Sequence, residues 1–280
     1  MNEKITQWLD RQFRKVDISH IRRTRNIRLI PDLKNRRGGK LAYGEWAHVI
    51  GIFQTVIYQT LNEKTGNHIL DIGCGTGLLG IASEPFVSDK GTYTGIDVMI
   101  EDITFCREHY PFSNYHFIHL DVANPAYASA QSSHLKPWPV QDASQDLVTA
   151  LSVWTHLSEK DARFYMKEVS RVLKPNGKAI ITFFCLDEEY EQSLPNRTDK
   201  PGRFHTRPQT EWIFNVNAYE SENWFTTKLT SQPEDAIAVT KQGLDSLVNE
   251  AGLKIDQYYP GNWKEQPGVF FQDIFILSKS

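Results

Sequence analysis

The ten residues from His68 to Gly77, HILDIGCGTG, constrain the fold more strongly than any other stretch of this 280-residue chain. The first half is short and apolar, which is typical of a buried parallel strand. The second half alternates glycine with small residues, and a helical pattern begins at Leu78. Strand, glycine turn and helix in this order form a nucleotide site, because glycine lets the backbone approach a ligand and the free N–H groups of the helix start attract its anionic part.

The glycine turn has more than one interpretation. Residues 75–80 also read as G-x-G-x-x-G, the dinucleotide fingerprint, which is weak by itself. Asp71 stands just before the glycines, and a pyrophosphate would gain nothing from its carboxylate. The resulting motif, DIGCGTG, resembles the first motif of class I S-adenosylmethionine (SAM) methyltransferases. The alternatives are an NAD(P)-dependent oxidoreductase, a non-catalytic SAM-fold binding protein, and a turn that binds nothing.

The resemblance implies how the amino-acid end of SAM is held. Asp71 would attract the ammonium group, directly or through water. The backbone around Gly73, Cys74, Gly75 and Gly77 would offer N–H groups to the carboxylate. The Cys74 side chain is interpreted as packing, because this turn needs only a small residue.

Two further acidic residues end predicted strands. Asp97 follows Gly73 by 24 residues and closes a strand over 91–97, the interval expected of a carboxylate that accepts both ribose hydroxyls. Val98 and Met99 would then contact the adenine. The resemblance assigns Asp121, after a strand over 115–120, to the adenine amine, and the N–H of Val122 to the ring.

Later segments extend the resemblance. Residues 135–148 read like the family's approach to strand four, with Gln145 in place of an aromatic residue. Strand four is predicted over 147–153, and Leu151 at its end is assigned to the cofactor. The motif SVWTHL over 152–157 and the turn RVLKPNG over 171–177 also resemble family sequences.

These elements predict an α/β fold. We expect a Rossmann-like, seven-stranded, mostly parallel sheet with an antiparallel last strand and helices on both faces. Strand five is predicted over 178–184, and strands six and seven over 253–259 and 269–277. The last two follow each other with no helix between them, which resembles the family's closing hairpin.

The expected domains are an N-terminal helical extension, 1–64, and a SAM-binding domain, 65–280. Helical spacing predicts helices over about 5–16 and 44–61. Residues 1–40 carry 12 Lys and Arg against 4 Asp and Glu, while the remainder carries 19 against 30. The basic segment suits an acidic partner such as RNA, a phosphorylated metabolite or a carrier protein, or an arm that pairs with the acidic remainder. Because no RNA-binding motif accompanies the arginines, pairing is favoured and nucleic acid is disfavoured.

An insertion at about 186–238 interrupts the pattern. It has poor periodicity but seven aromatic residues, so it must bury something. A long insertion at the carboxyl edge of a sheet is typically a lid or a substrate-binding segment, and a subunit contact is the alternative. We expect Tyr43 and Trp46, with rings such as Trp212 and Trp224, to cover the cofactor and acceptor.

The predicted reaction is methyl transfer from SAM to a hydroxyl, or an amine, of a small-molecule acceptor that can be anionic. The Pro-Cys nucleophile of base-flipping cytosine enzymes is missing, and the Asn/Asp-Pro-Pro-aromatic motif of base-amino methylation is replaced by LSVW over 151–154. His156 is the candidate base, because imidazole accepts protons near neutral pH. Asp187, Glu188 and His205 are substitutes.

Composition sets the remaining expectations. With 40% hydrophobic residues the chain can build a sizeable core. There is no apolar run of membrane-spanning length and no leader, so a cytoplasmic protein is expected. The three cysteines, Cys74, Cys106 and Cys185, are too far apart for a metal cluster or a disulfide framework, so no metal is expected.

Overall fold

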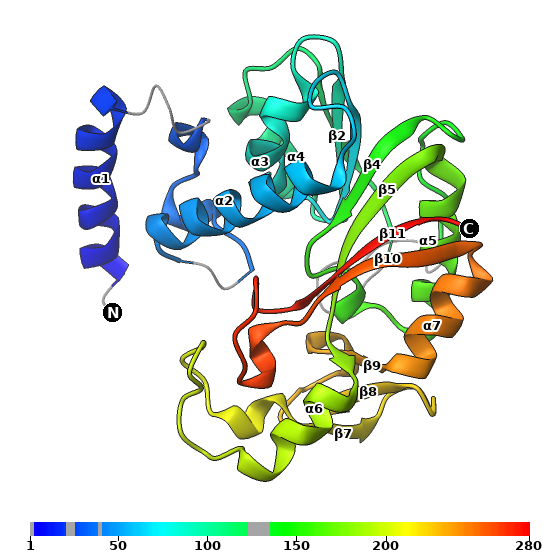
Figure 1. The fold of residues 1–280 in the computed structure, drawn as a ribbon. Helices are drawn as coiled ribbons and strands as arrows, with labels where there is room; N and C mark the ends of the chain where they lie inside the picture. The colour runs from blue at the N-terminus through cyan, green and yellow to red at the C-terminus, as the bar shows by residue number, and fades with distance from the viewer. Residues whose placement is uncertain (1–2, 21–25, 39–40, 123–134) are drawn as a thin grey trace. The chain divides into compact units, whose positions relative to one another are not determined.

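The computed structural model describes residues 3–20, 26–38, 41–122 and 135–280 (Figure 1). The chain divides into two compact units, Met1–His119 and Leu120–Ser280. The first unit therefore combines the expected N-terminal extension with the first three strands. Within the described ranges, none of the helices has both the length and the apolar character needed to cross a membrane.

The first unit is built on parallel strands joined by helices. Its strands are β1 (His68–Ile72), β2 (Thr92–Asp97) and β3 (Tyr115–His119), and its α-helices are α1 (Glu3–His20), α2 (Tyr43–Thr60), α3 (Leu78–Val87) and α4 (Ile100–His109). In this parallel register Asp71 lies beside Gly95, and Asp97 beside His119. The carboxyl ends of the three strands therefore meet at one edge.

The second unit contains the antiparallel closure. Its larger strands are β4 (Gln145–Ala150), β5 (Leu173–Phe183), β10 (Leu253–Tyr259) and β11 (Asp273–Lys279), with helices α5 (Glu159–Val172) and α7 (Lys241–Glu250). β4 and β5 are parallel, whereas β11 is antiparallel to both β5 and β10. The strand order is β10-β11-β5-β4-β1-β2-β3, which confirms the predicted seven-stranded α/β class.

The inserted segment forms a second, four-stranded sheet. Its strands are β6 (Cys185–Leu186), β7 (Phe214–Asn217), β8 (Trp224–Thr227) and β9 (Ala238–Thr240), in the order β6-β9-β8-β7, and α6 (Glu188–Ser193) follows β6. Phe184, Tyr190, Phe214 and Trp263 form a buried aromatic cluster there. The rings of the insertion thus bury one another, together with residues from the end of the chain.

Three predicted strand boundaries differ from the structure by three residues or more. β4 ends at Ala150 and not at 153, because Ser152 takes a left-handed conformation (φ 61°) and donates its N–H to Thr182 Oγ1. β5 begins at Leu173, opposite Gln145, before the register shifts. β11 begins at Asp273 and not at 269, because the preceding residues bond to the turn at Asn262 and Trp263. Of the predicted loop 123–145, residues 123–134 lie outside the described residues.

Candidate functional site

The glycine turn after β1 needs residues without a Cβ. Gly73, Gly75 and Gly77 have φ values of 64°, 50° and 88°, which most other residues avoid. The Gly77 N–H closes the turn on the Cys74 carbonyl at 2.8 Å. Gly77 is also the N-cap of α3 and brings no side chain to cap that helix. The first N–H groups of α3 therefore suit an anionic group of a ligand.

Asp97, at the end of β2, is bonded directly to this turn. Its Oδ2 accepts the Gly75 N–H at 2.7 Å, and its Oδ1 accepts the Met99 N–H at 2.8 Å. Burial raises the pKa of Asp97, although these N–H groups partly offset the rise. Each oxygen of an ionised carboxylate has two lone pairs, so both can accept a second bond from a ribose diol. Val98 and Met99 follow and are half-buried, and their contact with the adenine stays a prediction.

Asp71 has a buried partner that the sequence did not indicate. Its side chain is 1% exposed, and its Oδ2 accepts the Tyr93 hydroxyl at 2.6 Å. Burial raises the pKa of Tyr93 well above its ordinary value, so this phenol stays a donor. The interpretation of the Cys74 side chain as packing agrees with the structure, because a Cβ on Gly95 would lie 2.8 Å from its Sγ.

Residues 35–37 lie on the glycine turn, which sequence reasoning missed. The Arg37 guanidinium bonds to Asp102 through Nε (2.9 Å) and Nη2 (2.5 Å), and the Thr76 hydroxyl donates to the Asn35 carbonyl at 2.6 Å. A Cβ on Gly75 would lie 3.6 Å from Arg37 Cγ. The one sequence signal for this contact was the basic segment. The sequence did not indicate which acidic residue pairs with Arg37, because Asp102 is 65 residues away.

The basic segment pairs with acidic residues of its own unit where it is described. Besides the Arg37 pair, Arg36 lies 2.6 Å from Asp10 with its side chain fully buried. The Arg37–Asp102 pair agrees with the expected pairing with the acidic remainder, whereas Asp10 belongs to the basic segment itself and the buried Arg36 is not solvated. Arg22, Arg23 and Arg25 lie outside the described residues.

Tyr43 and Trp46, predicted to cover the ligands, are both buried. They are 6% and 1% exposed and lie on α2, which packs against α3. The Tyr43 hydroxyl donates to the Ile27 carbonyl at 3.3 Å. The structure therefore gives both rings contacts inside the first unit, and their contact with a cofactor stays a prediction.

Three predicted cofactor residues belong to the second unit. Asp121 is exposed, and its Oδ2 lies 3.4 Å from Lys136 Nζ. Val122 is buried, and its N–H bonds to the Leu120 carbonyl at 2.8 Å. Leu151 is half-buried, directly after β4. Their roles toward the adenine stay predictions.

His156 is held at the end of β4 in the form that a proton acceptor needs. Its Nδ1 lies 2.7 Å from the Glu234 carbonyl, which can only accept, so Nδ1 carries the proton and Nε2 offers its lone pair. Nε2 lies 3.5 Å from the hydroxyl of Ser152. Burial lowers the pKa of His156, although the bond to Glu234 opposes this. The imidazole is therefore neutral at neutral pH.

Asp187 serves as a structural ion-pair residue and not as a free base. It caps α6 through Tyr190 N–H, and its Oδ2 accepts Lys264 Nζ at 2.7 Å and the Tyr258 hydroxyl at 2.6 Å. Burial favours a higher pKa, but these donors lower the net pKa of Asp187. A carboxylate stabilised in this way is a weak proton acceptor. Glu188, the other acidic substitute, begins α6.

His205, the remaining candidate base, pairs with a carboxylate. Its Nε2 lies 2.8 Å from Glu265 Oε1. The ring lies against Trp212 and Phe271, with centroids 5.9 and 5.6 Å away.

Trp224, the other predicted covering ring, is 2% exposed in β8, with the Arg163 guanidinium 5.8 Å from its centroid.

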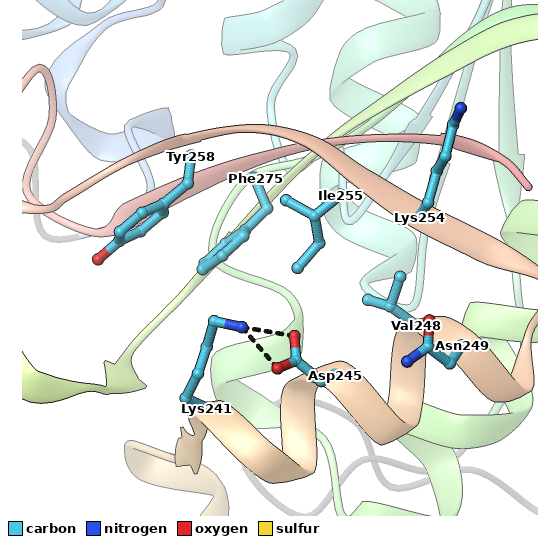
Figure 2. Close-up of a pocket in the computed structure, with 8 residues that line it drawn as sticks. All are labelled: Lys241, Asp245, Val248, Asn249, Lys254, Ile255, Tyr258 and Phe275. Atoms are coloured by element: carbon cyan, nitrogen blue, oxygen red, sulfur yellow. Dashed lines mark hydrogen bonds and ion pairs between the residues drawn. The ribbon is translucent and has the colours of Figure 1, made fainter.

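A pocket of ≈ 270 Å³ lies between α7 and the closing strands (Figure 2). Lys241 and Asp245, which face each other there, form an ion pair at 2.5 Å. None of the predicted site residues lines this pocket, so we assign the pocket no catalytic step.

In the described part of the chain, no three His, Cys, Asp or Glu side chains gather as metal ligands.

Comparisons with known proteins agree with the geometry of the glycine turn. Residues 70–181 match the family described as "Methyltransferase domain". An "O-methyltransferase" of Pyrenophora dematioidea is 31% identical over 132 residues, which cover 47% of this chain and 45% of that protein. "O-methyltransferase resE" of Aspergillus sclerotiorum is 29% identical over 146 residues, covering 52% and 48%. The chain thus spans about half the length of the curated relatives it matches.

A solved structure supports the fold. The SAM-dependent methyltransferase of Mesorhizobium loti aligns with a TM-score of 0.51 at 15% identity, over 81% of this chain and 96% of that one. Identity this low shows the fold alone. The family match is what points to the chemistry: residues 70–181 of this chain are similar to the methyltransferase domain.

Proposed function

We propose that this protein transfers a methyl group from SAM to a hydroxyl group of a small-molecule acceptor. The observation that carries the proposal is the bond between Gly75 N–H and Asp97, which joins the glycine turn to the carboxylate proposed to bind the ribose. The names of the two O-methyltransferase relatives support oxygen as the acceptor atom. An amine acceptor is the second possibility from the sequence, and no contact in the structure favours it.

Residues of the first unit fit the methyl donor. The turn Gly73–Gly77 and the start of α3 would receive the carboxylate, and Asp97 the ribose hydroxyls. Asp71, which accepts a hydrogen bond from Tyr93, is the carboxylate proposed to attract the ammonium group, directly or through water. When bound, SAM supplies an activated methyl group on a sulfonium. The protein's task is then to align the acceptor and exclude water.

His156 is proposed as the proton acceptor. A hydroxyl attacks weakly while it keeps its proton, so a base with a free lone pair assists the attack. Because the Glu234 carbonyl holds the proton on Nδ1, Nε2 is the His156 nitrogen that can accept, and the Ser152 hydroxyl lies 3.5 Å from it. Ser152, which bonds to Nε2 from a left-handed backbone conformation, orients the ring from the other side.

The test begins with cofactor binding. Calorimetry with SAM, S-adenosylhomocysteine and NAD should show binding of the first two only. A panel of phenols, alcohols and amines is then incubated with SAM, and methylated products are detected by mass spectrometry. Methyl ethers support the proposal. Binding of NAD without SAM, or SAM binding with no product from any acceptor, would remove it.

A further inference from the structure

Two buried nitrogen atoms in the inserted segment have no hydrogen-bond partner among the described residues. They are Nδ1 of His205 and Nε1 of Trp212. Their rings pack edge to face, with centroids 5.9 Å apart, and Phe271 lies against both. A buried polar atom without a partner is costly, so two of them on touching rings indicate a place for a ligand group.

The chain fixes His205 so that Nδ1 stays available. The side chain is 9% exposed, and its Nε2 donates to Glu265 Oε1 at 2.8 Å. The other oxygen, Oε2, accepts the Arg203 N–H at 2.8 Å. Glu265 is itself held in the left-handed conformation, φ 62°. An imidazole that carries its one proton on Nε2 presents a lone pair at Nδ1.

Gly202 makes room for this pair. A Cβ at residue 202 would lie 2.2 Å from His205 Nε2 and 2.5 Å from Glu265 Oε1. Any other residue would push the imidazole and the carboxylate out of place. The backbone is thus adapted to hold one orientation of His205, as expected of a binding residue.

Each atom needs a particular kind of partner. Trp212 Nε1 can only donate, and His205 Nδ1 of a neutral imidazole accepts. A hydroxyl group can serve either atom, because its oxygen accepts while its hydrogen is donated. A carboxylate has no hydrogen to donate to His205 and would approach the Glu265 charge. A protonated amine cannot accept from Trp212. The aromatic faces of Trp212 and Phe271 add a preference for a flat apolar body.

We propose that His205 and Trp212 bind a hydroxyl group of an aromatic acceptor against Phe271. This rests on the proposed function, since it names the acceptor class of the same enzyme. The reaction that supplies the substrate is then one that leaves a free hydroxyl on an aromatic ring.

The experiment measures binding rather than turnover. The full chain, saturated with S-adenosylhomocysteine, is titrated with 2-naphthol and with 2-methoxynaphthalene, which lacks the hydroxyl hydrogen. Each of two substitutions removes one hydrogen-bonding function: Trp212→Phe keeps an aromatic ring without N–H, and His205→Lys keeps a donor for Glu265 without an acceptor atom. Trp8→Phe, at a side chain 57% exposed on α1, is the matched control.

We expect wild type and Trp8→Phe to bind 2-naphthol about tenfold more tightly than the ether, a difference of about 1.4 kcal/mol. Each test variant should lose that preference while it binds the ether as before. The indole N–H resonance that disappears in Trp212→Phe should shift in wild type when 2-naphthol is added. Equal binding of both probes, or a preference kept by both variants, would overturn the inference. Absence of SAM binding would instead defeat the proposed function.

Discussion

The backbone N–H of Gly75 donates a 2.7 Å hydrogen bond to Asp97, so the glycine turn after β1 is attached to the end of β2. The two motifs are 22 residues apart in the sequence, yet they form one structural feature. The Asp97 side chain would then both order the glycine turn and bind the cofactor. Removing this side chain should therefore weaken SAM binding by more than the loss of one cofactor contact would.

Asp97→Ala should weaken SAM binding by about 1.5–3 kcal/mol, the range for hydrogen bonds to a charged group. The substitution removes the proposed ribose contact and releases Gly75. Calorimetry measures the change, and Asp89→Ala, at an exposed position of the same unit, is the control. An affinity equal to that of wild type would exclude Asp97 from the cofactor site.

Arg37→Ala should lower both SAM affinity and the free energy of unfolding. Asp102 has a side chain 3% exposed and would lose its cation, at a cost of about 1–3 kcal/mol for a buried group left unsatisfied. Urea unfolding measures the stability, and calorimetry the affinity. In the double variant Arg37→Ala/Asp102→Asn, residue 102 is uncharged and leaves no unpaired buried carboxylate. The double variant should therefore recover part of the free energy of unfolding but not the SAM affinity. If affinity returns as well, Arg37 acts only through Asp102.

The regular elements were predictable because each carries its own periodic signal. β1 contains the apolar residues Ile69, Leu70 and Ile72, β10 begins with the alternating residues Leu253–Asp256, and Gly252 ends α7 with φ 69° as predicted. The second sheet was not predictable. Its strands have only two to four residues, which is too short for an alternating pattern to be recognised.

The motif residues of the candidate site were predictable, but their partners were not. Asp97 and the glycines stand in a local motif with fixed spacing. The pairs Arg37–Asp102 and His205–Glu265 are separated by 65 and 60 residues, and neither member has a distinctive neighbourhood. Such contacts arise from tertiary packing, which leaves no periodic trace in one sequence.

Lys264→Met should destabilise the second unit by roughly 3–5 kcal/mol, as when one partner of a buried ion pair is removed. Lys264 is fully buried, and its Nζ contacts Asp187 at 2.7 Å and Asp273 at 2.9 Å. Without Lys264, the carboxylates of Asp187 and Asp273 lose the cation that they share. Lys241→Met breaks a half-exposed pair with Asp245 and should cost less than about 1 kcal/mol. Urea unfolding curves compare the two, and equal losses would show that the buried cation is dispensable.

The last prediction concerns His156 and pH. Burial lowers its pKa below the ordinary 6.5, and the ring accepts a proton only when neutral. Turnover should therefore be constant near neutral pH and fall as the pH drops through that lowered pKa. Protonation also opposes folding: below pH 6.5 the unfolded chain gains the proton first, so the His156 contribution to stability decreases as the pH falls.

His156→Ala should lower turnover by about 10²–10⁴, the usual contribution of a general base, with SAM affinity unchanged. It should also remove the acidic limb of the pH profile. His48→Ala, at an exposed position on α2, is the control and should keep both. A second substitution, His156→Gln, separates structure from chemistry, because its amide can occupy the site of the ring but cannot accept the proton. Normal turnover in His156→Gln, or an acidic limb that survives it, would make His156 a structural residue at the start of α5.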